Sequence, residues 1–169
     1  MTRIGVSGHR QLRDEHVVTE MTQAVLNRVL EHAAEVVVVS SIAEGADRLV
    51  AELVLARAGA TLEIILPLPA DDFVDDFESE ASRREFWDLL ERASIVTVVE
   101  QVPDEERAAA YERAGHAVVD TCDVVVALWD GRPSRGRGST ADVIQYALDH
   151  DVLVEVVLVE RGDADRAAT

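Results

Sequence analysis

The sequence contains no lysine, and this absence excludes several kinds of chemistry. All 16 basic residues are arginine, so no amine is present for a Schiff base, a pyridoxal phosphate anchor or a Walker-type phosphate loop. The single cysteine, Cys122, permits neither an intrachain disulfide nor a cysteine-based metal cluster. The five histidines are not spaced as metal ligands. We therefore expect a protein that holds no metal and needs no cofactor.

Positive charge is scarce as well, because 33 acidic residues outnumber the arginines and give a net charge of −17. A surface this acidic repels phosphate backbones and anionic lipids, so we expect a small-molecule partner, with no nucleic acid and no membrane. The sequence has no apolar run of transmembrane length, and it opens directly into an apolar strand without a signal peptide. These features favour a reduced, cytoplasmic compartment.

Aromatic residues are also few, at 4% against 48% hydrophobic residues, so the core must consist mainly of Val, Leu, Ile and Ala. That composition is typical of a parallel sheet buried under helices. Short Val- and Ile-rich runs alternate with segments of helical periodicity, and the runs span 3–7, 36–40, 62–66, 95–99, 124–128 and 152–159. The alternation predicts an α/β fold: a three-layer, Rossmann-like domain with a mostly parallel, doubly wound sheet of about six strands. Its central strands should include 3–7 and 124–128.

We expect a single domain over residues 1–161 and a frayed tail over 162–169, where the chain is polar and small. Residues 70–92 are acidic but carry apolar side chains at intervals, which predicts a helical excursion between the third and fourth strands. Such an excursion could form a flap over a pocket. A plain amphipathic helix is the favoured alternative.

Ligands of open α/β sheets bind beyond the carboxyl ends of the strands, and the first such end here is Ser7, Gly8, His9 and Arg10. The small residues let backbone amides approach a ligand, while His9 and Arg10 add cationic or switchable donors. A tight turn with solvated arginines is an equally good interpretation of these residues alone.

The second strand end leads into a helix through Ser41, Glu44, Gly45 and Asp47. Glu44 or Asp47 could hold a ribose hydroxyl, and small residues would offer amides to a ligand. Ser41 and Glu44 also have the spacing of a capping box. Ordinary helix capping is therefore the interpretation that these residues favour by themselves.

The third strand end is the most informative, because a glycine-rich basic loop runs from Asp130 to the start of the last helix. It holds three arginines and no acid between Asp130 and Asp142. Free amides, a helix dipole and full positive charges in one place suit phosphate. A solvated loop is the alternative, but the loop's charge opposes that of the whole chain, which favours anion binding. The expected ligand-binding residues are Asp130, Gly131, Arg132, Arg135, Arg137, Gly138, Ser139 and Thr140.

At these three segments the sequence resembles the superfamily that joins the DNA-processing protein A fold, the Lonely Guy phosphoribohydrolases and the SLOG ligand-sensor domains. Residues 5–10, Gly-Val-Ser-Gly-His-Arg, resemble the opening strand and loop of the SLOG and DNA-processing groups. Residues 39–47 are similar to their second-strand motif, in which small residues end in Gly-x-Asp. Residues 122–131 and 138–142 resemble the last nucleotide-binding strand and its Gly-Thr-x-x-Glu helix start. The match runs from residue 3 to 158 in the same motif order.

The resemblance implies a stand-alone SLOG-type domain that binds or senses a nucleotide-type ligand, such as a nucleoside monophosphate or an ADP-ribose-like molecule. One alternative is an N-glycosidic phosphoribohydrolase acting on nucleoside 5'-monophosphates, with Asp142 and either Arg113 or Arg84 as the catalytic pair. The other is a structural or interaction protein without catalysis. A homo-oligomer, most simply a homodimer, is a further expectation.

Two departures from the Lonely Guy pattern make the non-enzymatic interpretation the preferred one. Asp142 stands where those enzymes carry Glu, and their catalytic arginine falls on Ala114, one residue beyond Arg113. A one-residue shift turns a side chain by about 100° around a helix. We therefore expect Arg113 to point away from the site and either Tyr111 or His116 to face the ligand as a stacking or hydrogen-bonding group.

Overall fold

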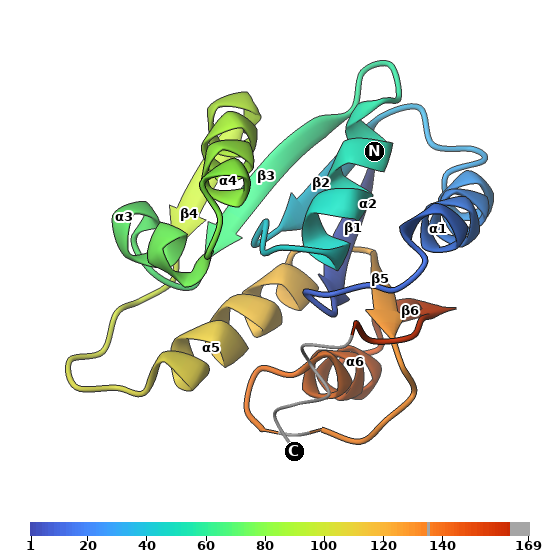
Figure 1. Ribbon diagram of the computed structural model, residues 1–169. Helices are drawn as coiled ribbons and strands as arrows, with labels where there is room; N and C mark the ends of the chain where they lie inside the picture. Colours follow the sequence, from blue (N-terminus) through green and yellow to red (C-terminus); the bar gives the residue numbers. More distant parts are fainter. Residues whose placement is uncertain (135, 163–169) are drawn as a thin grey trace.

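The computed structural model describes residues 1–134 and 136–162, and its strands form one parallel sheet in the order β4-β3-β2-β1-β5-β6 (Figure 1). The strands are β1 (Thr2–Gly8), β2 (Val36–Ser40), β3 (Thr61–Leu66), β4 (Ile95–Val98), β5 (Val124–Trp129) and β6 (Leu153–Leu158). The helices are α1 (Glu15–Val29), α2 (Ala46–Leu55), α3 (Ala70–Phe73), α4 (Glu80–Arg92), α5 (Arg107–Asp120) and α6 (Thr140–Asp149), and a 3-10 turn, η1 (Val74–Asp76), follows α3. The predicted Rossmann-like α/β fold with a parallel sheet is confirmed.

The order of the strands reverses between β1 and β5, which are both central. From β1 the chain winds outward through β2 and β3 to β4, and α5 then carries it back across the sheet to β5. Gly8 at the end of β1 is in register with Leu128 of β5. Two loops therefore diverge at the carboxyl ends of these strands, which is where doubly wound folds form their ligand clefts.

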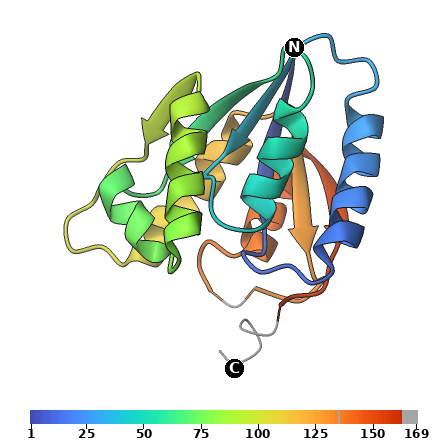
Figure 2. The same ribbon diagram turned by 45° about the horizontal axis from the view of Figure 1, so that its top comes forward.

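Helices cover both faces of the sheet, so the molecule has three layers (Figure 2). Helices α1, α2 and α4 lie on one face, and α5 and α6 lie together on the other. The central strands β2 and β5 are buried almost throughout, which explains why their sequences are continuous Val-rich runs and not alternating ones. Every helix in residues 1–134 and 136–162 is too short or too polar to span a membrane.

The core contains a local cluster of aromatic rings beneath the segment from α3 to α4. Phe73, Phe77 and Phe86 are fully buried and pack edge to face or tilted, with ring centroids 5.1–5.8 Å apart. The predicted helical excursion over residues 70–92 is thus present, but it is divided into α3, η1 and α4. The rings fix α3 and η1 at the carboxyl edge of the sheet.

The start of α2 differs from the capping box expected at Ser41 and Glu44. Gly45 occupies the N-cap position with φ of 76°, and no side chain caps this helix. Ser41 instead donates to the carbonyl oxygen of Ile65 in β3. A Cβ atom at Gly45 would lie 2.2 Å from the carbonyl oxygen of Arg10, so a side chain is excluded there by both backbone conformation and space. The close approach of the loop after β1 therefore determines this turn.

Candidate functional site

A cavity of about 340 Å³ opens at the switch point between β1 and β5. It is lined by the end of β1 and the loop after it, the segment from the end of β2 to the start of α2, one side of α5, and the loop that leads into α6 with the start of that helix. Eight of the residues predicted to bind a ligand contribute to this lining: Ser7, Gly8, Arg10, Asp47, Tyr111, Arg137, Gly138 and Thr140. The structure thus brings all three predicted segments to one cavity.

His9 does not line the cavity; it links the loop after β1 to the loop after β5. The backbone amide of Asp130 donates to His9 Nε2 over 3.0 Å, and Asp130 Oδ1 lies 3.2 Å from the same nitrogen. The carboxylate of Asp130 also lies 2.8 Å from Arg161 Nε. Burial opposes ionisation of Asp130, but the amide of Arg132 and the neighbouring His9 and Arg161 outweigh it and lower the pKa of the carboxyl. Asp130 is therefore engaged within the chain, and Gly131 beside it also lies outside the cavity lining.

Asp47 is the buried acid of the cavity. Its side chain accepts a hydrogen bond of 2.9 Å from Ser40 Oγ and is only 7% exposed. Burial raises the pKa of this carboxyl to about 6, although hydrogen bonds from Ser40 and backbone amides and the charge of Arg10 act in the opposite direction. The carboxyl can therefore change its charge near neutral pH, inside the cavity.

Arg10 and Tyr111 form the outer wall of the cavity. The guanidinium carbon of Arg10 lies 5.7 Å from the centroid of the Tyr111 ring. The Tyr111 hydroxyl donates to Asp76 Oδ2 at the end of η1. Asp76 also pairs with Arg107 at the start of α5, over 2.6 Å, and lies 3.9 Å from Arg10. The sequence contained no local signal for Asp76 or Arg107, because they are separated by 31 residues.

The basic loop meets the cavity through Arg137 and Gly138. The guanidinium of Arg137 donates two hydrogen bonds to Glu112 Oε2, from Nε over 3.0 Å and from Nη2 over 2.7 Å. Gly138 has φ of 76°, and a Cβ atom there would lie 2.9 Å from the backbone nitrogen of Glu112. Arg132 lies beside Asp130 at the far end of this loop, and the predicted contact of Arg135 falls outside the described residues.

Ser139 and Asp142 form a capping box at the start of α6. The amide of Asp142 donates to Ser139 Oγ, and the amide of Ser139 donates to Asp142 Oδ2, each over 3.3 Å. Within residues 1–134 and 136–162, the amides of Thr140 and Ala141 have no hydrogen-bond acceptor. The helix therefore presents two amides and the positive end of its dipole beside the cavity.

The proposed catalytic pair, Asp142 and Arg113, is not assembled. Arg113 makes a two-pronged ion pair with Glu105, with the shorter contact at 2.5 Å, and lines a separate groove beside β4. Asp142 is occupied by its capping box at the start of α6. Neither residue lines the switch-point cavity.

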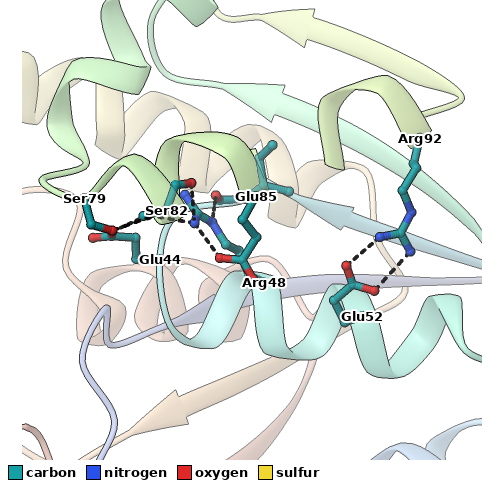
Figure 3. A network of polar contacts seen from close by, with 8 residues as sticks. Glu44, Arg48, Glu52, Ser79, Ser82, Glu85 and Arg92 are labelled. Atoms are coloured by element: carbon teal, nitrogen blue, oxygen red, sulfur yellow. Dashed lines mark hydrogen bonds and ion pairs between the residues drawn. The ribbon is translucent and has the colours of Figure 1, made fainter. Parts of the chain in front are cut away.

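Glu44 and Gly45 lie at a larger groove of about 980 Å³ between the loop after β1, α2 and α4. Figure 3 shows the polar network there: Ser82 Oγ donates to Glu44, and Arg48 reaches from α2 to α4. The carboxylate of Glu44 is thus held by α4 and does not reach the switch-point cavity. Among the described residues, no group of acids, histidines and the cysteine is arranged to hold a metal ion.

A parallel sheet with its strand order reversed at β1 and β5, and a cavity at that point, defines a Rossmann-like fold. No protein-family model and no curated protein matches the sequence. Solved structures of DNA processing protein A (DprA) do match its fold. The protein from Streptococcus pneumoniae superposes with a TM-score of 0.63 at 19% identity over 92% of this chain, and the chain spans 50% of its length.

A second match is DprA from Helicobacter pylori, whose structure is described for its mode of binding single-stranded DNA. The TM-score is 0.64 at 13% identity, and the alignment covers 98% of this chain and 70% of that protein. At these identities the comparisons establish the fold alone, and they confirm the expected resemblance to the fold of DprA.

Two expectations are corrected by this comparison. A small nucleotide-type ligand was expected and nucleic acid was excluded, whereas the matching structures are of a DNA-processing protein. The exclusion relied on the net charge of −17, which sums the whole surface. The cavity itself is lined by Arg10 and Arg137 against a single acid, Asp47. The charge of the whole chain therefore does not describe the charge of the cleft.

Proposed function

We propose that this chain binds single-stranded DNA in the cleft at the carboxyl ends of β1 and β5. The observation that carries the proposal is the convergence of Arg10, Arg137 and the N-terminal end of α6, at Thr140, on one cavity. Arginines and helix N-termini are the groups with which proteins hold phosphate. The fold similarity to DprA, including the Helicobacter pylori protein described for single-stranded DNA binding, supports the same choice.

The size and wall of the cavity favour a single strand over a duplex. A cavity of about 340 Å³ is of the size of one nucleotide and cannot enclose a double helix. Arg10 lies over the Tyr111 ring and presents a flat cationic surface. Unpaired bases stack on such surfaces whatever their sequence, and a duplex keeps its bases stacked on each other. We therefore expect little sequence preference.

The acidic surface sets the strength and the salt dependence of binding. Two or three arginine–phosphate contacts predict a slope of about −1.4 to −2.1 for log Kobs against log salt, on the basis of about −0.7 for each phosphate on a single strand. Repulsion from the rest of the chain weakens association at low ionic strength. The affinity should therefore be modest and the slope shallow compared with strongly basic DNA-binding proteins.

The test is fluorescence anisotropy with a labelled oligothymidylate and with the matching duplex, at several salt concentrations. We expect Arg137→Gln and Arg10→Gln each to weaken binding to the single strand by about tenfold, because one charge-assisted contact of this kind contributes on the order of 1.5 kcal/mol. Arg57→Gln is the matched control, since Arg57 lies after α2, outside the cavity lining, and changes the net charge equally. Equal losses for all three variants, or no binding by the unmodified protein, would refute the proposal.

A further inference from the structure

Two hydrogen-bond donors and a further guanidinium group, from two parts of the chain, surround one carboxylate at the rim of the cleft. Asp76 accepts from the Tyr111 hydroxyl and from Arg107 Nη2 over 2.6 Å, and Arg10 Nη2 lies 3.9 Å from its Oδ2 atom. Arg10 comes from the loop after β1, whereas Arg107 and Tyr111 lie on the first turns of α5. Two guanidinium groups and a phenol around one anion form an arrangement that suits a phosphate group.

Asp76 is held in this position by the aromatic core. It is the last residue of η1 and lies between Phe73 and Phe77, which are fully buried. The two rings pack 5.1 Å apart, and Phe73 also contacts Tyr111 with ring centroids 6.0 Å apart. The carboxylate is thus a fixed part of the site and does not depend on a mobile side chain from the surface.

The position of Arg107 also indicates an anion site at the rim of the cleft. Arg107 is the first residue of α5, where the helix dipole is positive and a cation is unfavourable. Its guanidinium turns toward η1, donating to Asp76 and to the carbonyl oxygen of Asp72 over 3.4 Å. It is 49% exposed, so a ligand from solvent can reach it. Asp76 supplies the negative charge that this cation requires in the free protein.

We infer that Arg10, Arg107 and Tyr111 form a phosphate subsite at the rim of the cleft, and that Asp76 occupies it as an internal competitor. The inference rests on the proposed function, since the phosphate is that of a DNA strand passing through the same cleft. The carboxylate neutralises one of the two cations and repels a phosphate, so the free protein binds DNA more weakly than its arginines alone would allow. The carboxylate therefore sets the affinity of the site.

The test is a double-mutant cycle between Asp76→Asn and Arg107→Gln, measured with the labelled oligothymidylate. Asparagine keeps an oxygen to accept from Tyr111 while it removes the charge. We expect Asp76→Asn to tighten binding by about tenfold, because it releases the Arg107 guanidinium from its ion pair and lets it pair with a phosphate. Arg107→Gln should have little effect alone, and it should abolish the gain in the Asp76→Asn background.

Asp75→Asn is the matched control, because Asp75 is the exposed neighbour of Asp76 and its loss changes the net charge by the same amount. Thermal unfolding of each variant separates a loss of fold from a loss of binding, and Asp76→Ser provides a second neutral side chain if the Asn variant is unstable. Equal effects of Asp75→Asn and Asp76→Asn, or independent effects of the two cycle mutations, would overturn the inference while leaving DNA binding intact.

Inorganic pyrophosphate serves as a second probe that does not depend on DNA. Calorimetric titration of the same four proteins should show tighter binding to the Asp76→Asn variant, and Arg107→Gln should remove that gain. If the oligonucleotide does not bind but pyrophosphate follows this pattern, the proposed function fails and the phosphate subsite stands. If pyrophosphate binding is the same in all four proteins, the subsite is refuted.

Discussion

The side chain of His9, at the end of β1, accepts a hydrogen bond from the backbone amide of Asp130, at the end of β5, over 3.0 Å. His9 is buried, and its own amide donates to the carbonyl oxygen of Leu128 over 3.2 Å. These two contacts fix the loops that diverge at the switch point. The width of the cleft thus depends on a side chain that does not line it.

Replacing His9 by alanine should therefore destabilise the protein and loosen the cleft. The change leaves the buried amide of Asp130 without its acceptor, which costs about 1–3 kcal/mol. Urea unfolding followed by circular dichroism measures the loss. His32→Ala is the control, since the His32 side chain is 92% exposed and its removal should change stability by less than about 0.5 kcal/mol. Similar losses in the two variants would contradict the role given to His9.

Asp47 should make both stability and DNA binding depend on pH. Its pKa is raised in the folded protein to about 6, against about 3.9 in an unfolded chain. A raised pKa contributes stability that is fully present below the unfolded value and is lost as the pH rises through the folded value. Unfolding free energy should therefore fall by about 2 kcal/mol between pH 4 and pH 7 through this residue. Asp47→Asn should remove that part of the pH dependence in urea unfolding measured across this interval.

Binding should follow the same titration, because ionised Asp47 places a negative charge in the cavity. A phosphodiester does not titrate in this range, so we expect the oligonucleotide to bind about three- to tenfold more tightly at pH 5 than at pH 7.5. The Asp47→Asn variant should bind with little change over that interval. A pH dependence that persists in this variant would assign the effect to another group.

The sequence predicted the fold well because the relevant signals are local. Each strand is a Val- or Ile-rich run, and each strand end that forms the cleft carries its glycine and arginine residues next to it in the chain. The expected capping box at Ser41 and Glu44 failed for the opposite reason. Ser41 bonds to β3 and Glu44 to α4, and both partners are far away in the sequence.

The rim of the cleft was not predictable for the same physical reason. Asp76 meets Arg107 and Tyr111 only because the buried rings of Phe73 and Phe77 fix η1 beside α5. The net charge was misleading in a related way, because it contains no information on where the charges lie. Arg137 and Arg10 line the cavity, whereas many of the acids lie elsewhere on the surface.

Arg48 should be a strong determinant of stability, although it lies outside the switch-point cavity. Its guanidinium bridges α2 and α4 through Ser82 and Glu85, over 2.8 Å in each case (Figure 3). It also lies 4.5 Å from the Phe77 ring centroid. Because this side chain is only 4% exposed, Arg48→Met should cost about 2–4 kcal/mol in urea unfolding, from lost charge-assisted hydrogen bonds.

Arg92 offers a matched comparison on the same pair of helices. Arg92 pairs with Glu52 through two contacts, the longer of 3.0 Å, but both side chains are more than two-fifths exposed. Exposed pairs of this kind contribute about 0–1 kcal/mol, so Arg92→Met should cost far less than Arg48→Met. Equal losses of unfolding free energy in the two variants would mean that burial does not determine how strongly these arginines stabilise the protein.

The final prediction is that the protein does not release free base from nucleoside monophosphates. Hydrolysis of this kind needs a carboxylate and an arginine held together over the ribose. Here Asp142 accepts the Ser139 amide over 3.3 Å, and Arg113 pairs with Glu105 beside β4. Asp142→Asn should therefore act on stability, with a loss of about 0.5–2 kcal/mol from the weakened capping box. Incubation with AMP, CMP, GMP and IMP, followed by chromatography of the free bases, tests the prediction directly. Turnover that Asp142→Asn abolishes would show that the capping box opens and delivers its carboxylate to a substrate.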